Sequence, residues 1–349
     1  MHRKVWIGIS MAVLVLAVVV GLVYWPRPQA DGVKIGVALP LTGDAAVYGK
    51  ALKNGIELAL EEHLQSGGFP VTLVYEDDQY APKMAVSAIQ KLIQVDKVPA
   101  IIGGAGSTTA EPVIPICDKN KVVLISPCAT APSLSGASPY FFRLWPSDNY
   151  DGTVMADTAY GKLGIRKVAI LYVNAPYGLG ITRVFTERFE SLGGKVSIAE
   201  AYAQGATDFR AQLTKIKDDG AEWVFVPGYV KELTNVLKQA VELGLKVKFL
   251  GVNSMYDPKL LEVAGKAADG AVFSVPTYDA ASDDPIIKKF VIAYKAKYGS
   301  DPDAFAATGY DAMRVIIESI RSGGGNSSAD ILKGMHSIRN FGLLAIQCG

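Results

Sequence analysis

Histidine and cysteine are scarce in this sequence, with three of each among 349 residues. The histidines, His2, His63 and His336, lie far apart, and none has a candidate nucleophile or second metal ligand nearby in the sequence. A G-x-S-x-G nucleophile elbow, an H-E-x-x-H zinc motif and a P-loop are also missing. The sequence therefore indicates that the chain is not an enzyme, and we expect no metal and no cofactor. We expect His63, in a charge-rich segment, to be solvated.

An excess of charge of one sign is missing too, because 35 Lys and Arg residues stand against 34 Asp and Glu residues. Residues 1–30 hold three of the basic residues and no acid, so the remainder carries 32 basic and 34 acidic residues, a formal charge of −2. This balance provides no electrostatic footprint for DNA or RNA. We therefore expect no nucleic acid partner.

The cysteines are Cys117, Cys128 and Cys348. Cys117 stands near the end of a predicted helix, and Cys128 just past the end of the next predicted strand. In a β-α-β arrangement these ends lie at opposite edges of the sheet, about 17–20 Å apart, whereas a disulfide tolerates a Cα separation of only about 4.4–6.8 Å. We predict that Cys117 and Cys128 are not bonded to each other.

Residues 1–30 form a separate segment. Basic residues at positions 3 and 4 precede an uncharged run of 21 residues, Val5 to Trp25, which is long enough to cross a bilayer core of about 30 Å as a helix. The basic start favours export of the residues after the run. The run exceeds the apolar part of a typical secretory signal, about 7–15 residues. These features favour an uncleaved membrane anchor, with a signal peptide cleaved after Ala30 as the alternative.

From residue 33 onward, apolar runs alternate with amphipathic segments, which is typical of parallel sheets covered on both faces. The expected strands are Val33–Leu39, Val71–Tyr75, Ala100–Ile102, Val122–Ile125, Lys167–Tyr172, Lys195–Glu200, Trp223–Val226, Val247–Leu250 and Ala271–Val275. The expected helices are Ala46–Leu64, Ala81–Val95, Thr108–Cys117, Tyr150–Lys162, Tyr177–Ser191, Phe209–Lys217, Lys231–Leu243, Pro285–Tyr298, Pro302–Arg321 and Ser328–His336.

The pattern pauses at Ala131–Asn149, which is rich in Pro, Ser and Gly, and a second crossing is expected at Pro276–Pro285. The sequence thus predicts an α/β fold of two doubly wound parallel-sheet lobes joined by a hinge. The first lobe is expected to hold residues 31–147 and 277–340, and the second residues 148–276 and 341–349. Two such sheets facing each other form a cleft that can close by hinge motion.

Candidate ligand-binding residues follow the predicted strands, because ligands of open α/β sheets bind at the carboxyl ends of strands. The stretch Gly104-Ala-Gly106-Ser107 opens a predicted helix but has Thr109 where a dinucleotide fingerprint needs a third glycine. A helix N-terminus favours an anion such as a carboxylate, and Ser107 caps this helix, contacts the ligand, or does both. Thr130 is expected at the same edge. For Asp77-Asp78, at another strand end, the sequence favours a loop pair that accepts backbone hydrogen bonds over a catalytic carboxylate pair.

Several short stretches occur in a recognisable order over residues 33–342: P-L-T-G at 40–43, Y-E-D-D at 75–78, residues 103–112, I-S-P-C-A-T-A-P at 125–132, Y-G at 177–178 and G-Y at 228–229. In this order the chain resembles the leucine/isoleucine/valine-binding protein family, type I periplasmic receptors of branched-chain amino acid and amide ABC transporters. The resemblance implies an extracytoplasmic receptor that captures an amino acid or related carboxylate or amide between its lobes and delivers it to permease subunits, and the uncharged run at residues 5–25 is expected to anchor it in the membrane. A membrane-anchored sensor of the same fold is the alternative.

The resemblance also implies residue roles in the first lobe. In such receptors a serine at the position of Ser107 and a threonine at that of Thr130 hold the ligand's α-carboxylate. The backbone at Cys128 contributes, and we include the neighbouring Ala129 among the ligand-binding residues. The Cys128 side chain is expected to narrow the cleft, because family members often have a smaller residue there.

The aromatic residues and one departure complete the expected site. Tyr48 resembles the family's aromatic that packs on the ligand from the first loop, and Tyr177 and Tyr229 match second-lobe aromatics that close over it. The amino-acid receptors place a glutamate for the ligand's ammonium where this chain has Asn253. A buried ammonium without a carboxylate partner is costly. Either another acid substitutes, with Asp279 as the candidate, or the ligand lacks a fixed positive charge.

The last residues, 341–349, also depart from the family pattern. Family members continue with a further strand pair, so we expect a truncated or frameshifted reading frame that lacks about 30 residues. The second lobe would then lack its closing strands.

Overall fold

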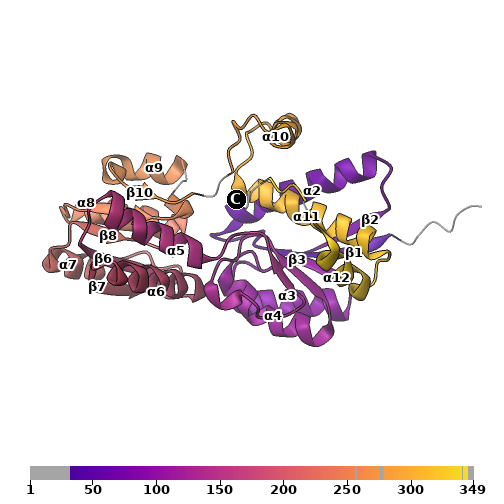
Figure 1. The fold of residues 1–349 in the computed structure, drawn as a ribbon, viewed down its shortest axis with the longest axis horizontal. Helices are drawn as coiled ribbons and strands as arrows, with labels where there is room; N and C mark the ends of the chain where they lie inside the picture. Colours follow the sequence, from indigo (N-terminus) through magenta and orange to yellow (C-terminus); the bar gives the residue numbers. More distant parts are fainter. Residues whose placement is uncertain (1–31, 256–257, 276–277, 340, 345–349) are drawn as a thin grey trace, which may run out of the picture.

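The computed structural model describes residues 32–344 of the chain, apart from 256–257, 276–277 and 340. The described strands form two five-stranded parallel sheets, each with helices on both faces, placed side by side (Figure 1). The predicted α/β fold of two doubly wound parallel sheets is confirmed. The predicted anchor or signal segment and Cys348 lie outside the described residues. No helix within the described ranges is long and apolar enough to span a membrane.

The first sheet has the strand order β2-β1-β3-β4-β5. Its strands are β1 (Val33–Leu39), β2 (Val71–Asp77), β3 (Ala100–Gly103), β4 (Val123–Ser126) and β5 (Phe141–Arg143). Every residue of β3 and β4 is buried, which explains their continuous apolar sequence. The strand order reverses between β1 and β3, and such switch points are where open sheets bind ligands.

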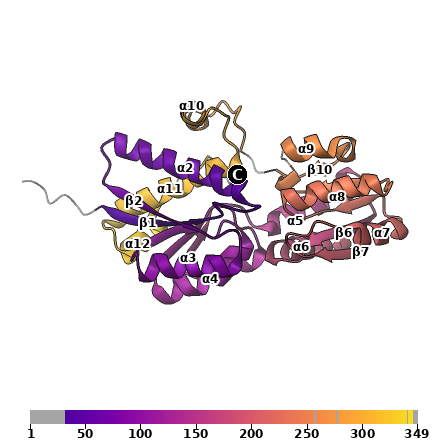
Figure 2. The ribbon, with the colours of Figure 1, turned by 180° about the vertical axis from the view of Figure 1, so that it is seen from behind.

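Helices cover both faces of the first sheet and define the first lobe (Figures 1 and 2). One face carries α3 (Pro82–Gln94) and α4 (Ser107–Asn120), and the other carries α2 (Ala46–Gln65), α11 (Ala304–Gly323) and α12 (Ser328–Ser337).

The helices α2 and α11 pack backbone against backbone. A Cβ atom on Gly55 would lie 2.0 Å from the carbonyl oxygen of Ala306, and one on Gly309 would lie 2.2 Å from that of Leu52. Both glycines are therefore required by space. Their contact joins segments that are about 250 residues apart in the sequence, so the first lobe is built from both ends of the described chain.

The second sheet repeats this topology with the order β10-β9-β8-β6-β7, which reverses between β6 and β8. Its strands are β6 (Lys167–Val173), β7 (Lys195–Tyr202), β8 (Trp223–Phe225), β9 (Lys248–Gly251) and β10 (Val272–Phe273). The helices are α5 (Asp148–Asp157), extended by a π-helical turn at Thr158–Lys162, then α6 (Pro176–Ser191), α7 (Arg210–Asp219), α8 (Val230–Glu242) and α9 (Pro258–Ala264).

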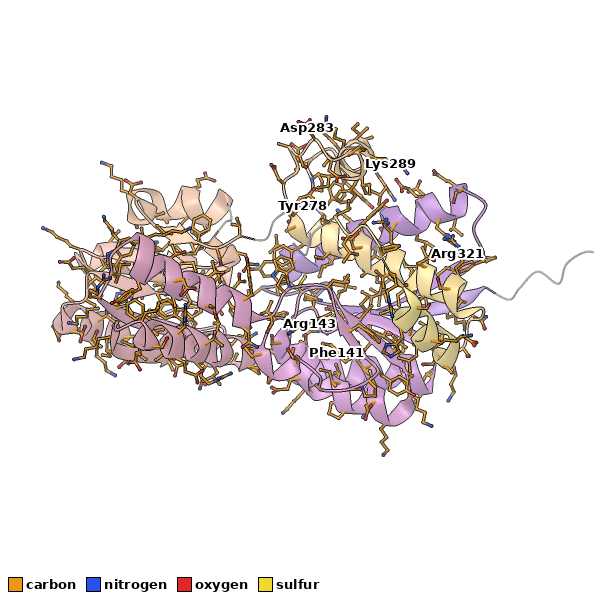
Figure 3. All side chains as sticks on the ribbon, in the orientation of Figure 1. Phe141, Arg143, Tyr278, Asp283, Lys289 and Arg321 are labelled. Atoms are coloured by element: carbon orange, nitrogen blue, oxygen red, sulfur yellow. The ribbon has the colours of Figure 1, made fainter. Side chains whose placement is uncertain are left out.

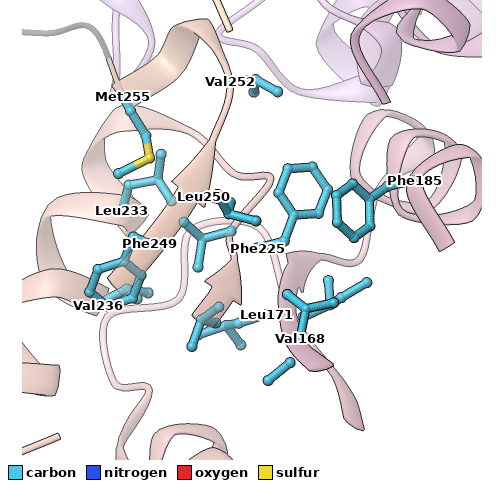
Figure 4. Close-up of a cluster of buried hydrophobic side chains, with 14 of the residues drawn as sticks. Val168, Leu171, Phe185, Phe225, Leu233, Val236, Phe249, Leu250, Val252 and Met255 are labelled. Carbon is cyan, nitrogen blue, oxygen red and sulfur yellow. The ribbon is translucent and has the colours of Figure 1, made fainter. Parts of the chain in front are cut away.

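Aromatic rings form the centre of the second-lobe core (Figure 4). The ring of Phe225 stacks on that of Phe185 with centroids 4.4 Å apart, and Phe185 stacks on Phe189 at 5.4 Å. All three side chains are fully buried. This core holds β8 against α6 and so sets where the loops after β6 and β8 begin.

One strand and one α-helix within the described residues were not predicted. The strand β5 has three half-buried residues at the edge of its sheet and lies in the Pro-, Ser- and Gly-rich stretch where the apolar pattern pauses. The helix α9 has seven residues, fewer than periodicity can reveal. The other predicted elements are present, with ends shifted by a few residues.

Residues 341–344, which were expected in the second lobe, lie against the first. The backbone N–H of Leu344 donates to the Asp311 carboxylate at 2.6 Å, and Arg314 donates to the carbonyl oxygen of Gly342 at 2.8 Å. The side chain of Leu344 is buried in the first-lobe core. The helix α10 (Pro285–Tyr298), flanked by Asp283 and carrying Lys289, stands out above α11 (Figure 3).

Of the predictions made for the cysteines and for His63, one is confirmed and one is wrong. Cys117 and Cys128 are both free thiols, so the prediction that they are not bonded to each other is confirmed. The expectation for His63 is wrong, because its side chain is buried, packs on the Phe69 ring and lies 3.0 Å from that residue's carbonyl oxygen.

Candidate functional site

A cavity lies between the two lobes, at the carboxyl ends of the strands where both sheets reverse. Its volume is about 60 Å³, counted as the space open to the centre of a water molecule. About 10–15 Å³ of such space holds one water, so only a compact molecule fits. The predicted residues that line it are Tyr48, Ser107, Cys128, Thr130, Tyr177, Tyr229 and Asn253.

Ser107 lies at the N-terminus of α4, beneath the cavity. Gly106, not Ser107, is the N-cap residue, so the expected capping role is wrong. The Ser107 hydroxyl oxygen instead accepts the backbone N–H groups of Thr130 at 3.2 Å and Ala131 at 3.0 Å. Since the oxygen is the acceptor in both bonds, its hydrogen can still be donated to an anion at the helix N-terminus.

The loop after β4 is held in place by Arg143, which lies at the border between the lobes (Figure 3). Its guanidinium donates to the carbonyl oxygens of Thr130 at 3.2 Å and Ala131 at 3.0 Å, and to the Ser135 hydroxyl at 2.6 Å. Three donors in a planar fork fix the loop more firmly than a single charge would. Thr130 is therefore presented to the cavity by its supporting loop.

A buried carboxylate, Asp148, lies behind Thr130. Its backbone N–H donates to the Thr130 carbonyl oxygen at 2.9 Å, and its carboxylate bonds the Thr130 hydroxyl. Burial, together with nearby Asp151, raises the pKa of Asp148 to about 8 against the opposing effects of Thr130 and Arg143. One of its oxygens has no hydrogen-bond partner among the described residues. This carboxyl group is thus buried behind Thr130 with one oxygen unpaired, and the nearby charge of Arg143 offsets its burial only in part.

Aromatic rings form the walls of the cavity. Tyr177 stacks on Tyr229 with centroids 5.5 Å apart, and the ring of Tyr80 meets Tyr229 edge-on at 5.4 Å. From the first lobe, Tyr48 packs on Phe305 at 4.7 Å. Burial raises the pKa of Tyr177 and Tyr229 above the ordinary value, so both phenols stay protonated.

The two lobes touch directly around the cavity. The backbone N–H of Val230 donates to the Tyr48 hydroxyl at 3.3 Å, and Lys231 pairs with Asp44 at 2.5 Å. Each contact joins one lobe to the other. The lobes are therefore in contact with each other beside the cavity.

Cys128 and Ala129 differ in their relation to the cavity. The Cys128 side chain lines it, with its sulfur 3.5 Å from the Thr308 hydroxyl. Burial raises the pKa of this thiol to about 12, so it presents an uncharged wall. Ala129 is fully buried and does not line the cavity; its N–H donates to the Ser126 hydroxyl at 3.0 Å.

The candidate replacement for the missing glutamate is not at the site. Asp279 is exposed, does not line the cavity and accepts the nearby N–H of Ala281 at 2.8 Å. A buried acid that bonds the cavity residue Thr130 is Asp148, which sequence reasoning missed because nothing in the local sequence marks this aspartate as buried. No group of three potential metal ligands occurs within the described part of the chain.

Asp77 and Asp78 have the loop role that the sequence favoured. The Asp77 carboxylate accepts the N–H groups of Leu41 at 2.9 Å and Gln79 at 3.0 Å, and the Asp78 carboxylate accepts that of Tyr80 at 2.8 Å. They thereby place Tyr80, a cavity residue that was not predicted. Its position just after a strand was an available signal, whereas Phe305, at the start of α11, had none.

Comparison with known proteins agrees with this geometry. Residues 32–345 match the family model described as periplasmic binding protein. The leucine-, isoleucine-, valine-, threonine- and alanine-binding protein of Pseudomonas aeruginosa is 31% identical over 299 residues, which cover 84% of this chain and 79% of that protein.

Solved structures show the same relation. A leucine-binding protein from Thermotoga maritima superposes with a TM-score of 0.84 at 32% identity, covering 90% of this chain and 89% of that chain. An ABC-transporter solute-binding protein from Rhodopseudomonas palustris, solved with 3,4-dihydroxybenzoic acid, superposes with a TM-score of 0.77 at 30% identity, covering 87% and 85%. The chain therefore belongs to the Leu/Ile/Val-binding protein family of type I periplasmic binding proteins, a family of binding proteins and not of enzymes.

Proposed function

We propose that this chain captures a compact amino acid in the interlobe cavity and delivers it to the permease of an ABC transporter. One observation carries the proposal: one cavity brings Ser107 and Thr130 of one lobe together with Tyr177 and Tyr229 of the other. The names of the relatives, which specify leucine and other small amino acids, support the same ligand class.

The carboxylate of the ligand binds at the N-terminus of α4. The helix dipole and its free N–H groups favour an anion there, and the Ser107 hydroxyl adds a donor. Because the Ser107 oxygen already accepts two backbone N–H groups, its hydrogen is directed away from the loop. This end is common to all amino acids and does not select among them.

The ammonium of the ligand faces the buried polar groups beyond Thr130. Thr130, which the resemblance assigns to the carboxylate, is assigned to the ammonium in this proposal because its hydroxyl bonds the Asp148 carboxylate. The hydroxyls of Thr130 and Tyr177 and the amide oxygen of Asn253 accept the ammonium hydrogens, with Asp148 behind Thr130. The Tyr177 hydroxyl and one Asp148 oxygen lack protein partners within the described residues, as expected of groups that complete their bonds with a ligand. When ionised, Asp148 takes the electrostatic place of the acid that Asn253 does not supply.

Thermal unfolding and titration calorimetry of the full chain test this proposal with alanine, valine, leucine and phenylalanine. A ligand at a hundred times its Kd stabilises the folded state by about 2.7 kcal/mol, a rise in Tm of a few degrees for a chain of this size. We expect Ser107→Ala to weaken binding at least tenfold.

Ser126→Ala is the matched control. The Ser126 hydroxyl also accepts an N–H group from the same loop, that of Ala129 at 3.0 Å, but it does not line the cavity. Equal losses of affinity in the two variants would show that Ser107 acts only on the loop. A wild-type chain that unfolds cooperatively and is stabilised by none of the amino acids would contradict the proposal.

An aromatic carboxylic acid is the second candidate ligand. Asn253 in place of an acid, the ring-lined cavity and the likeness to a protein solved with 3,4-dihydroxybenzoic acid favour it. A ligand of this kind uses the same carboxylate end but brings no ammonium. Stabilisation by benzoates with none by amino acids would support this candidate over the first.

The lobes and the membrane segment complete the proposal. Closure runs through the crossings near residues 144–149 and 276–282, and residues 5–25 hold the receptor at the outer, extracytoplasmic face of the cell membrane. A permease and an ATPase encoded beside this chain would favour transport. A kinase or receptor partner in that place would favour the alternative, a membrane-anchored sensor.

A further inference from the structure

Three tyrosines separate the inner cavity from a second, outer hollow at the mouth of the cleft. The outer hollow has a volume of about 670 Å³, counted in the same way as the inner one, and its walls include Asp44, Gln204 and Lys231. Tyr48, Tyr80 and Tyr229 line both spaces. The space available to a bound molecule is therefore limited on this side by the side chains of these tyrosines, which form a partition, and not by backbone.

Tyr80 is the member of this partition whose position depends on a strained backbone. Its φ is +55°, and that of the preceding Gln79 is +48°, so two successive residues with side chains adopt the left-handed region. Such backbone is unfavourable for residues other than glycine and persists where the surroundings enforce it, often at functional sites. Here the carboxylates of Asp77 and Asp78 enforce it by accepting the N–H groups of Gln79 and Tyr80.

Gly106 shows how closely the Tyr80 side chain covers the helix that receives the ligand. A Cβ atom at Gly106 would lie 1.9 Å from the Tyr80 hydroxyl oxygen, and its three nearest atoms all belong to Tyr80. The backbone of Gly106 is extended, with φ −140° and ψ 164°, which any residue adopts. Glycine is thus needed at position 106 because of the Tyr80 side chain, directly beside Ser107.

We propose that Tyr80 is a specificity-determining residue that limits ligand length by closing the inner cavity against the outer hollow. This inference rests on the proposed function, since it takes the inner cavity as the ligand site. Tyr48 and Tyr229 also make contacts outside the partition. Tyr48 accepts an interlobe hydrogen bond from the backbone N–H of Val230, and Tyr229 stacks on Tyr177. Tyr80 contacts the ring of Tyr229 across the lobes, but its removal leaves both of those contacts in place.

The test compares wild type with Tyr80→Gly on the series L-alanine, L-leucine, L-phenylalanine and L-tryptophan. Glycine suits the left-handed backbone at position 80, so the variant removes the ring without adding strain. We expect the affinity for tryptophan relative to alanine to rise at least tenfold in the variant. Gln79→Gly is the matched control, because it makes the same backbone change one residue earlier and keeps the ring; its ratio should equal that of wild type.

A second measurement tests the packing without a ligand. Gly106→Ala should lower the Tm of the wild-type chain, whereas the same change in the Tyr80→Gly background should lower it much less, since the clashing atoms are gone. Equal losses in both backgrounds would overturn the packing on which the inference stands.

The outcomes separate the two proposals. Wild type that binds members of the series, together with an unchanged tryptophan-to-alanine ratio in Tyr80→Gly, overturns the role of Tyr80 and leaves the proposed function standing. Wild type that unfolds cooperatively but binds none of the series overturns the proposed function and the role of Tyr80 with it.

Discussion

The two lobes contribute to the cavity by different means. The first lobe offers a loop and a helix terminus whose groups are held by internal hydrogen bonds, with Ser107, Ser126 and Arg143 at their centre. The second lobe offers the stacked rings of Tyr177 and Tyr229, which complete an aromatic wall with first-lobe rings. The hydroxyl of Tyr177 has no protein partner within the described residues. A preorganised end suits a group that every ligand carries. With a wall of rings, affinity depends instead on how well the ligand fills the remaining space.

The largest expected effect comes from breaking the second lobe alone. Phe225→Ala removes a fully buried ring that stacks on Phe185, and such changes lower the free energy of unfolding by about 3–5 kcal/mol. Calorimetry should show a lower Tm for this variant. Leu179→Ala, at a half-exposed residue of the same lobe, is the control and should stay within about 0.5 kcal/mol of wild type. An unchanged Tm in Phe225→Ala would refute the aromatic core of this lobe.

Loosening the first lobe should act on affinity. Arg143→Ala removes the donors that hold the Thr130 carbonyl, so a loss of about 1.5–3 kcal/mol is expected, roughly 10- to 150-fold in Kd. Calorimetric titration measures it. Arg183→Ala, which breaks an exposed pair with Glu187, should leave Kd unchanged. Similar affinities in the two variants would mean that the loop keeps its shape without Arg143.

The stability of the folded chain should depend on pH through Asp148. Its pKa is about 8 in the folded chain and 3.8 ordinarily, so between these values the folded state keeps a proton that the unfolded state has lost. The free energy of unfolding contributed by this group therefore falls as pH rises through that window. The Tm of wild type should fall relative to that of Asp148→Asn from about pH 5 to pH 8. Parallel curves would contradict the raised pKa.

The same group predicts how ligand affinity varies with pH. An ammonium ligand favours ionised Asp148, so amino-acid affinity should rise between about pH 6 and pH 8, and Asp148→Asn should abolish the rise. Asp151, Arg143 and Tyr177 are the charged and titratable groups around Asp148 that also influence it. A benzoate, which has no ammonium, should not bind more tightly as pH rises, and this distinguishes the two candidate ligands.

The smallest effect is expected at the mouth of the cleft. Lys231 pairs with Asp44 across the lobes, but both side chains are about half exposed. Pairs of this kind contribute about 0.2–1 kcal/mol, so Lys231→Ala should weaken binding only a few-fold. High salt should reduce the difference from wild type, because screening removes the contribution of an exposed pair. A loss that persists in high salt would assign Lys231 another role.

The fold could be predicted because its signals are local. The strand β1 was expected at its observed bounds, since seven successive residues with mostly apolar side chains cross a buried sheet. The strand β5 was missed because three half-buried edge residues carry no such pattern. The contact of residues 341–344 with the first lobe was missed because it depends on Asp311 and Arg314, which lie on α11.

The site was predictable where it depends on strand ends and family pattern. Ser107 and Thr130 come after neighbouring strands and meet as expected. Tyr80 reaches the cavity only because of a left-handed backbone, and Asp148 is beside it only because the chain crosses there between the lobes. Neither the conformation nor the burial of a polar residue can be read from local composition.

The backbone contact between α2 and α11 has a consequence for the order of folding. Gly55 is synthesised early, whereas its contact partner Ala306 follows the whole second lobe in the chain. Since domains generally fold as units when their segments become available, the second lobe, continuous from α5 to β10, can form its core while the first still lacks a helix. The lobe that carries Ser107 and Thr130 is thus the last to be completed.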